Sequence, residues 1–434
     1  MPTVYQQMSS DDLAAALADL RAQVDAVRAR GLKLDMARGK PSPAQVDISR
    51  PMLSLVDAAS DLHDGSVDCG NYGCFEGIPS ARALAAGFLG CPADQTLALG
   101  SSSLLIEYEA LSIFWRAGTC GNAPWSAYST AHEGRPVKIL CPVPGYDRHF
   151  GISDDLGIEN VPVPMTAEGP DMDEIERLAA SDDAIKGIWC VPKYSNPTGV
   201  TYTEEVVRRL ATMPTAAADF RILWDNAYCV HDLYDEGDEL ANIFEIAREA
   251  GTEDRMVAFA STSKITFPGA GIAFLGASPR VIAELSGHMK AGLISADKIN
   301  QLRHARFLPD MDAVRAHMRR HAAHLRPRFE LVERTLSAGL SGTGCATWSH
   351  PRGGYFVSFD GPAGSAKRIG ALCAGMGVTL TPAGATFPGG HDPADTNIRI
   401  APSYPDEDDL AAALEVLVLA TRLAAAELAW QERA

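Results

Sequence analysis

Short apolar runs recur along the middle of the chain, and each is followed by a polar loop and, in most cases, a helix-like segment. Their hydrophobic residues stand at consecutive positions, which is typical of strands buried on both faces. These runs occupy residues 96–99, 137–141, 185–191, 221–228 and 256–260. Because strand, loop and helix recur with no hairpin signal, we predict an α/β fold with a mostly parallel central sheet flanked by helices.

The two ends of the chain show a different pattern. Amphipathic stretches predict helices, and alternating or short apolar stretches predict strands, together forming a small α+β unit. The segments concerned are residues 13–30, 313–336, 351–359, 397–401 and 406–427. We expect three parts: residues 1–60, an N-terminal arm and helix with part of the small domain; residues 61–310, a large α/β domain; and residues 311–434, a C-terminal small α+β domain.

Composition changes this picture mainly through charge. The 434 residues are 46% hydrophobic and 21% charged, which is ordinary for a globular protein with a sizeable core. The formal net charge of −17 disfavours binding to nucleic acid and to anionic membrane surfaces. An anionic ligand therefore has to be bound by a local cluster of positive groups.

The nine cysteines are scattered and stand mostly in apolar surroundings, which predicts reduced thiols in a cytoplasmic protein. Cys69 and Cys74 are close together, but no second cysteine or histidine pair completes a zinc pattern, so we expect no metal. The N-terminus lacks a signal-peptide pattern, and no apolar run reaches the ~18 residues of a membrane span. We expect a cytoplasmic protein that does not enter the membrane.

Lys264 is the most unusual candidate for chemistry. It follows the apolar run 256–260 and precedes a Pro/Gly-rich turn at residues 267–271. Desolvation lowers the pKa of a lysine and makes its amine a nucleophile, as Schiff-base chemistry requires. The alternative is a lysine at a strand end that reaches solvent. Ser261 and Ser263 beside it add hydroxyl groups that could bind a phosphate.

Other loops carry groups suited to anions. Gly100 to Ser103 form a Gly/Ser turn between a strand and a helix, where free amides and the positive end of the helix dipole favour phosphate. The same turn would also serve simply to cap the helix. Gly39, between Arg38 and Lys40, is either a solvated turn or a second anion site.

Four motifs, in this order along the chain, resemble those of the fold type I pyridoxal 5′-phosphate (PLP) enzymes of aminotransferase class I/II. The motifs are Asn-Pro-Thr-Gly at 196–199, Asp225 with Tyr228, Ser-Thr-Ser-Lys at 261–264 and Asn-Ile-Arg-Ile at 397–400. The likeness extends over nearly the whole chain. Within the family, the chain looks most like the divergent bacterial branch of aspartate aminotransferases called type Ic.

The resemblance implies catalytic roles for three residues. Lys264 would bind the cofactor as a Schiff base and then move a proton to and from the substrate. Asp225 would pair with the pyridine nitrogen and keep the ring an electron sink. Tyr228, together with Asn196, would hydrogen-bond the phenolic oxygen of the cofactor.

It also implies binding roles. Tyr146 would stack on the cofactor ring, and Arg399 would bind the substrate α-carboxylate in a bidentate pair, helped by the Gly39 amide and by Arg38 or Lys40. Tyr72 would reach the phosphate from the neighbouring subunit of a homodimer with shared active sites. The remaining phosphate ligands would be hydroxyl groups: Ser101, Ser102, Ser103, Ser261 and Ser263.

One family feature is missing. Relatives usually carry an arginine shortly after the lysine, as a further phosphate ligand, whereas here residues 269–274 read Gly-Ala-Gly-Ile-Ala-Phe. Phosphate binding must therefore depend on the serines or on a cation from another segment.

The resemblance predicts transamination, with L-aspartate and 2-oxoglutarate as the substrates that we favour. A dicarboxylate needs a second cation, and Lys298 stands in the appropriate region, although it is more typical of a lysine on a helix surface. Arg38, Lys40, Arg148 and Lys193 are alternatives. Rival predictions are an aromatic or 2-aminoadipate aminotransferase, a PLP-dependent β-lyase and, remotely, an aminotransferase-like regulator.

Overall fold

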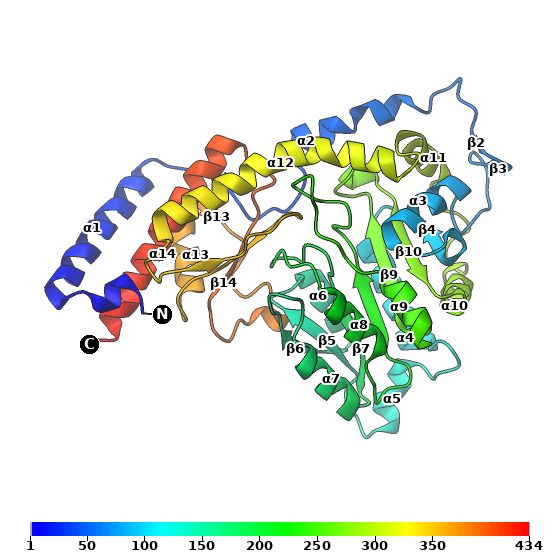
Figure 1. Ribbon diagram of the computed structural model, residues 1–434, viewed down its shortest axis with the longest axis horizontal. Helices are drawn as coiled ribbons and strands as arrows, with labels where there is room; N and C mark the ends of the chain where they lie inside the picture. Colours follow the sequence, from blue (N-terminus) through cyan, green and yellow to red (C-terminus); the bar gives the residue numbers. More distant parts are fainter. Residues whose placement is uncertain (1, 434) are drawn as a thin grey trace.

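A seven-stranded sheet forms the centre of the protein (Figure 1). The structure is a computed structural model and describes residues 2–433. The strand order is β4-β10-β9-β8-β7-β5-β6. The strands are β4 (Thr96–Ala98), β5 (Lys138–Val143), β6 (Glu159–Pro164), β7 (Ile185–Cys190), β8 (Arg221–Asp225), β9 (Met256–Ser261) and β10 (Ala273–Ala277).

All neighbouring strands from β6 to β9 run parallel, whereas β10 is antiparallel to both β9 and β4. The predicted α/β class and mostly parallel sheet are confirmed. The sequence interpretation missed β6, an edge strand that contains two prolines, and β10. It also found no hairpin signal, yet the loop from β9 to antiparallel β10 carries Lys264.

Two hydrophobic cores lie on opposite faces of this sheet. Strands β7 and β8 are buried at every residue, which explains their unbroken apolar sequence. One face packs against α3 (Pro79–Leu89), α7 (Met172–Ser181), α8 (Glu204–Thr212), α9 (Ile243–Ala250) and α11 (Lys298–Phe307). The other packs against α4 (Ser103–Ala117), α5 (Trp125–Ala131), α6 (Asp147–Asp155) and α10 (Pro279–Met289).

A third core joins the two ends of the chain. Strand β1 (Leu34–Asp35) pairs in parallel with β13 (Val378–Thr379), and α1 (Ser10–Ala29) packs against α14 (Glu407–Gln431). The same core contains α13 (Ala366–Gly375) and a three-stranded antiparallel sheet of β11 (Thr347–Trp348), β12 (Val357–Asp360) and β14 (Asn397–Ile400). The boundaries at residues 60/61 and 310/311 stay predictions.

The long helix α12 (Met311–Leu340) links these layers (Figure 1). Val314 and Met318, near its start, belong to a core of the central sheet, whereas Leu325 and Leu336 belong to the core of the chain ends. One rigid element therefore contributes to both hydrophobic cores.

Short elements complete the chain within residues 2–433. They are α2 (Pro43–Ile48), the β2 (His63–Asp64) and β3 (Val67–Asp68) hairpin, and the 3-10 helices η1 (Val4–Gln7), η2 (Arg50–Ser54), η3 (Ala93–Gln95), η4 (Glu253–Arg255), η5 (Pro268–Ala270) and η6 (Pro388–Gly390).

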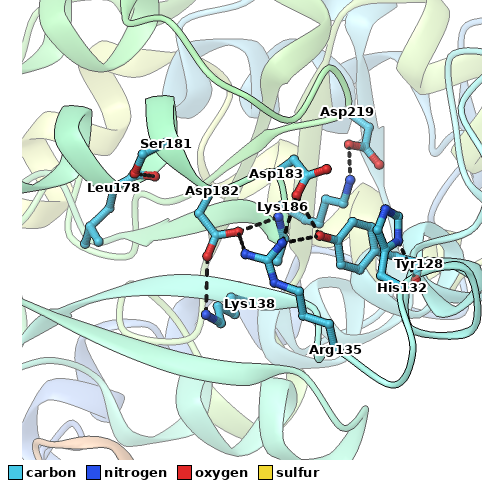
Figure 2. A network of polar contacts seen from close by, with 11 residues as sticks. Tyr128, His132, Arg135, Lys138, Leu178, Ser181, Asp182, Asp183, Lys186 and Asp219 are labelled. Atoms are coloured by element: carbon cyan, nitrogen blue, oxygen red, sulfur yellow. Dashed lines mark hydrogen bonds and ion pairs between the residues drawn. The ribbon is translucent and has the colours of Figure 1, made fainter.

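A charged network closes the sheet at the amino ends of β5, β7 and β8 (Figure 2). Arg135 contacts Asp182 at 2.6 Å and Asp183 at 3.3 Å, and Lys186 pairs with Asp219 at 2.8 Å. Each of these side chains pairs with one of opposite charge. We therefore interpret the network as structural support for the strand ends. The candidate chemistry lies at the other end.

Candidate active site

The predicted site residues lie mostly at the carboxyl ends of the strands. Asp225 is the last residue of β8, and Lys264 follows the end of β9. Asn196 follows β7, Tyr146 follows β5, and the turn that begins at Gly100 follows β4. Because carboxyl ends of parallel strands share one edge of a sheet, five loops meet there.

Lys264 extends into the space between these loops. Its Nζ lies 5.0 Å from the centre of the Tyr228 ring. Its carbonyl oxygen lies 3.4 Å from His231 Nε2 and accepts a hydrogen bond from the Tyr355 hydroxyl at 3.5 Å. Burial lowers the pKa of the Lys264 amine below its ordinary value of 10.5, although the charge of Asp225 acts in the opposite direction. The amine therefore loses its proton more readily than that of an exposed lysine.

Asp225 is a buried carboxylate, 3% exposed, in contact with a buried histidine. His149 Nε2 lies 3.2 Å from Asp225 Oδ2 and 3.4 Å from Glu107 Oε2. The other carboxylate oxygen, Asp225 Oδ1, has no hydrogen-bond partner among residues 2–433. One oxygen of Asp225 thus faces the protein, and the other needs a donor.

Two aromatic hydroxyls adjoin this carboxylate. Burial raises the pKa of Tyr146 and of Tyr228, and the Asp225 charge raises both further, so both phenols stay protonated. The edge of Tyr146 meets the His149 ring, with 5.0 Å between the ring centroids. Both residues can therefore donate hydrogen bonds within the site.

Arg399, on β14, is supplied by the core of the chain ends. Its Nη1 lies 3.4 Å from Asn196 Oδ1 and 3.4 Å from Asp147 Oδ1, and its guanidinium lies over the Phe356 ring at 4.7 Å. Its Nε is buried without a hydrogen-bond partner among the described residues. Gly39 packs on the same ring, because a Cβ there would come within 2.0 Å of Phe356 Cζ. Arg399, Asn196 and Gly39 are thus brought together.

The predicted serines also converge. Ser261 Oγ donates to Ser263 Oγ at 3.1 Å, and Ser263 Oγ donates to the Ser101 carbonyl at 3.5 Å. Ser102 caps α4 by accepting a hydrogen bond from the Leu105 amide at 3.4 Å, and Ser103 is the first residue of that helix. The helix start and these five serines, namely Ser101, Ser102, Ser103, Ser261 and Ser263, therefore form a cradle suited to an anion.

Among residues 2–433, the structure shows no side-chain contact of Arg38, Lys40 or Tyr72 with this site. Arg38 is exposed and pairs with Asp35 at 2.9 Å, while Lys40 Nζ lies 4.1 Å above the ring of Tyr404. Tyr72 is 81% exposed.

Two other candidate cations are already engaged. Lys193 pairs with Asp232 at 2.8 Å. Lys298 donates to the carbonyls of Asn71 and Gly73. The sequence favoured Lys298 as a helix-surface lysine, and this is wrong, since only 3% of it is exposed.

The segment after Lys264, where relatives carry an arginine, is held by hydrogen bonds between its backbone carbonyls and the side-chain amide of Asn300. Asn300 Nδ2 donates to the carbonyls of Ala270 at 3.1 Å and Gly271 at 2.9 Å. Arg303 Nη2 donates to Asn300 Oδ1 at 2.5 Å. An asparagine with an arginine behind it therefore supports the loop after Lys264.

Sequence reasoning missed His149 and Glu107. His149 stands three residues after Tyr146 and lies in α6, whereas the sequence interpretation used only Tyr146 and Arg148 from this segment. Glu107 is an acidic residue on the buried face of α4. An unpaired charge is costly on the buried face of a helix. A glutamate on an otherwise apolar helix face was therefore the sequence signal that could have identified Glu107 as a candidate.

A lysine with a lowered pKa and a buried aspartate at the carboxyl ends of the sheet strands, together with a guanidinium whose Nε has no partner among the described residues, define a candidate PLP site. The protein family model for "Aspartate amino-transferase" matches residues 8–433. The chain therefore belongs to the aspartate aminotransferase family of fold type I PLP-dependent enzymes, and it is an aminotransferase.

Individual relatives agree over nearly the full length. An aspartate aminotransferase of Corynebacterium glutamicum is 43% identical over 94% of this chain and 93% of its own. A Mycolicibacterium smegmatis protein is 48% identical over 98% of each chain. Its name describes it as an aminotransferase and gives no substrate. A crystal structure of a C. glutamicum aspartate transaminase covers 98% of this chain and 99% of its own with a TM-score of 0.94 and 41% identity.

The residues present fit PLP. A protonated pyridine nitrogen would supply the donor that Asp225 Oδ1 lacks. The serine cradle offers hydroxyls and a helix start to a phosphate, and Lys264 offers an amine to an aldehyde.

Within residues 2–433, no helix is long and apolar enough to cross a membrane.

Replacing Lys264 should change how stability depends on pH. In the unfolded chain the amine keeps its proton to about pH 10.5, whereas in the cofactor-free folded protein it releases it at lower pH. Between these pKa values the unfolded state binds more protons, so folding stability rises with pH. Lys264→Met should therefore stabilise the cofactor-free protein relative to wild type, most strongly below the lowered pKa, with the gain shrinking toward pH 10.5.

Urea denaturation from pH 7 to 10 measures this difference in the free energy of unfolding. Each pKa unit of lowering corresponds to about 1.4 kcal/mol. Lys33→Met, at an exposed lysine, controls for the change of side chain. A difference between Lys264→Met and wild type that does not vary with pH would contradict a lowered pKa.

Proposed function

We propose that the protein transfers the amino group of L-aspartate to 2-oxoglutarate, giving oxaloacetate and L-glutamate. The arrangement of Lys264, Asp225 and Arg399 around one space carries the aminotransferase chemistry. The preference for aspartate is supported by the full-length similarity to the C. glutamicum protein named aspartate aminotransferase.

The cofactor supplies an electron sink that stabilises the negative charge that develops on the substrate Cα. Asp225 Oδ1 would accept a hydrogen bond from the pyridine N–H and keep that nitrogen protonated. Tyr228 and Asn196 would donate to the phenolic oxygen, and Tyr146 would cover the ring. These contacts fix the cofactor relative to Lys264.

Lys264 and Arg399 act on the substrate. Arg399 holds the α-carboxylate in a bidentate pair with the help of the Gly39 amide, which orients the Cα–H bond toward Lys264. The neutral Lys264 Nζ would then take the Cα proton, and its lowered pKa makes the neutral amine more available as a base than that of an exposed lysine.

The phosphate would be held by the serine cradle, namely Ser101, Ser102, Ser103, Ser261 and Ser263. Tyr72 would contribute from a second copy of the chain, in a homodimer located in the cytoplasm. Exposed apolar side chains support such an interface, since Leu53 is 51%, Leu105 62% and Ile294 65% exposed. Tyr72, at 81% exposed, is free to contact another subunit.

The distal carboxylate of aspartate still requires a partner. Lys193 and Lys298 are engaged by Asp232 and by backbone carbonyls, so neither is a ready ligand in this structure. Arg38, Lys40 and Arg148 are exposed and able to move toward a substrate. We assign the distal contact to none of them.

The amino donor can be read from the absorbance of the PLP-loaded protein. Adding L-aspartate should convert the cofactor band to that of pyridoxamine phosphate, and 2-oxoglutarate should restore it. If only 2-aminoadipate or an aromatic amino acid converts the band, the aspartate assignment is wrong. Release of pyruvate and ammonia from β-substituted alanines, without band conversion, would indicate a lyase instead.

Arg399→Ala should lower kcat/KM for aspartate roughly a hundredfold, because two charge-assisted hydrogen bonds contribute about 3 kcal/mol. Steady-state kinetics measure the effect. The matched control is Arg177→Ala, which removes an arginine paired with Glu174 on the outer surface of α7. Equal kinetics for the two variants would exclude Arg399 from substrate binding.

A further inference from the structure

Three buried ionisable side chains from three different elements meet behind the cofactor site. Glu107 comes from α4, His149 from α6 and Asp225 from β8. One ligand atom from each lies within 4.8 Å of those of the other two. We call Glu107, His149 and Asp225 the carboxylate–imidazole cluster. The roles proposed above use Asp225 and leave Glu107 unexplained.

The His149 imidazole is held between the two carboxylates. Its ring stacks on Trp189, with 4.3 Å between centroids and 6° between planes, and it is 2% exposed. The same atom, Nε2, lies 3.2 Å from Asp225 Oδ2 and 3.4 Å from Glu107 Oε2. Nε2 makes no hydrogen bond of standard geometry among residues 2–433, so these contacts are ion pairs, in which His149 protonated on both ring nitrogens carries the positive charge that the two carboxylates share.

Glu107 has little else to stabilise it. It is 1% exposed, and neither carboxylate oxygen has a hydrogen-bond partner that meets standard geometry among residues 2–433. A buried carboxyl group either keeps its negative charge beside a cation or has a raised pKa and takes up a proton. Burial and the charge of Asp225 raise the pKa of Glu107, whereas the contacts with His149 and Ser103 lower it, so His149 is the cation that favours the ionised form.

The pKa of His149 depends on both neighbouring carboxylates. Burial acts to lower the pKa of His149, but the contacts with Asp225 and Glu107 outweigh it and raise the pKa to about 9. Other ionisable groups that interact with Asp225 or Glu107 are Lys264, Tyr146, Tyr228 and the thiol of Cys229, whose pKa is also raised by burial. Both phenols are protonated, so Glu107 is the second carboxylate that favours an imidazolium.

We propose that Glu107 is a positioning residue that keeps the proton on His149 Nε2, so that His149 binds Asp225 Oδ2 and leaves Oδ1 directed to the cofactor nitrogen. The inference rests on the proposed function, because it assumes that Asp225 faces the pyridine ring. With Glu107 ionised, the cluster carries two negative charges and one positive charge. A net negative charge then remains to stabilise a protonated pyridine nitrogen.

Glu107→Gln tests this role, since it removes the charge and keeps the shape. Histidine-selective NMR of the cofactor-free and the PLP-loaded protein reports the His149 pKa, with His149→Gln identifying its signal. We expect a decrease of about one unit or more, a tenfold loss of proton affinity. The PLP dissociation constant, measured by equilibrium dialysis, should rise about tenfold, and kcat should fall with little change in KM.

Glu109→Gln is the matched control, since Glu109 is a half-buried carboxylate on the same helix. It should change none of these quantities. Glu107→Asp keeps the charge and should restore most of the His149 pKa and of the PLP affinity. A purely structural role for Glu107 would instead lower the stability of both variants and leave the His149 pKa unchanged.

Three results would overturn the inference in distinguishable ways. An unchanged His149 pKa in Glu107→Gln, with covalent PLP attachment intact, removes the role of Glu107 and leaves the proposed function standing. An equimolar metal in purified wild type that is lost in Glu107→Gln makes the cluster a metal site. Failure of the wild type to bind PLP at all contradicts the proposed function as well.

Discussion

The buried negative charge of Asp225 is the constraint on which the site depends. A carboxylate in a strand covered on both faces is costly unless groups around it compensate the charge. His149 and Lys264 supply that compensation from two other elements, and Oδ1 has no hydrogen-bond partner among residues 2–433, as a site for a pyridine nitrogen would require. The same burial that makes Asp225 costly strengthens its interaction with a bound cation.

The architecture brings substrate and cofactor groups together from distant parts of the chain. The central sheet provides the loops that would hold PLP, and β14 of the chain-end core provides Arg399. Asn196 contacts Arg399, so this asparagine stands where the two parts meet. Helix α12 contributes to both cores, which ties the position of Arg399 to that of the sheet.

Short sequence motifs were sufficient to predict where some of the candidate site residues lie. Asp225 is the last residue of an apolar strand, Lys264 follows one, and Arg399 lies in one, so pattern and motif agree. His149, Glu107 and Lys298 depend on tertiary packing: each is buried because of what distant elements place beside it. Strand β8 ends at Asp225, whereas the apolar sequence predicted a strand to residue 228. The chain turns after Asp225, and the Tyr228 ring lies close to the Lys264 amine.

The central claim is that the Lys264 amine binds the cofactor aldehyde. Borohydride reduction of the PLP-loaded protein, followed by proteolysis and mass spectrometry, locates the attachment directly. We predict one phosphopyridoxyl group per chain, on the peptide that contains Lys264, and none in Lys264→Ala. A phosphopyridoxyl group on another lysine, or equal labelling of Lys264→Ala, would contradict the account.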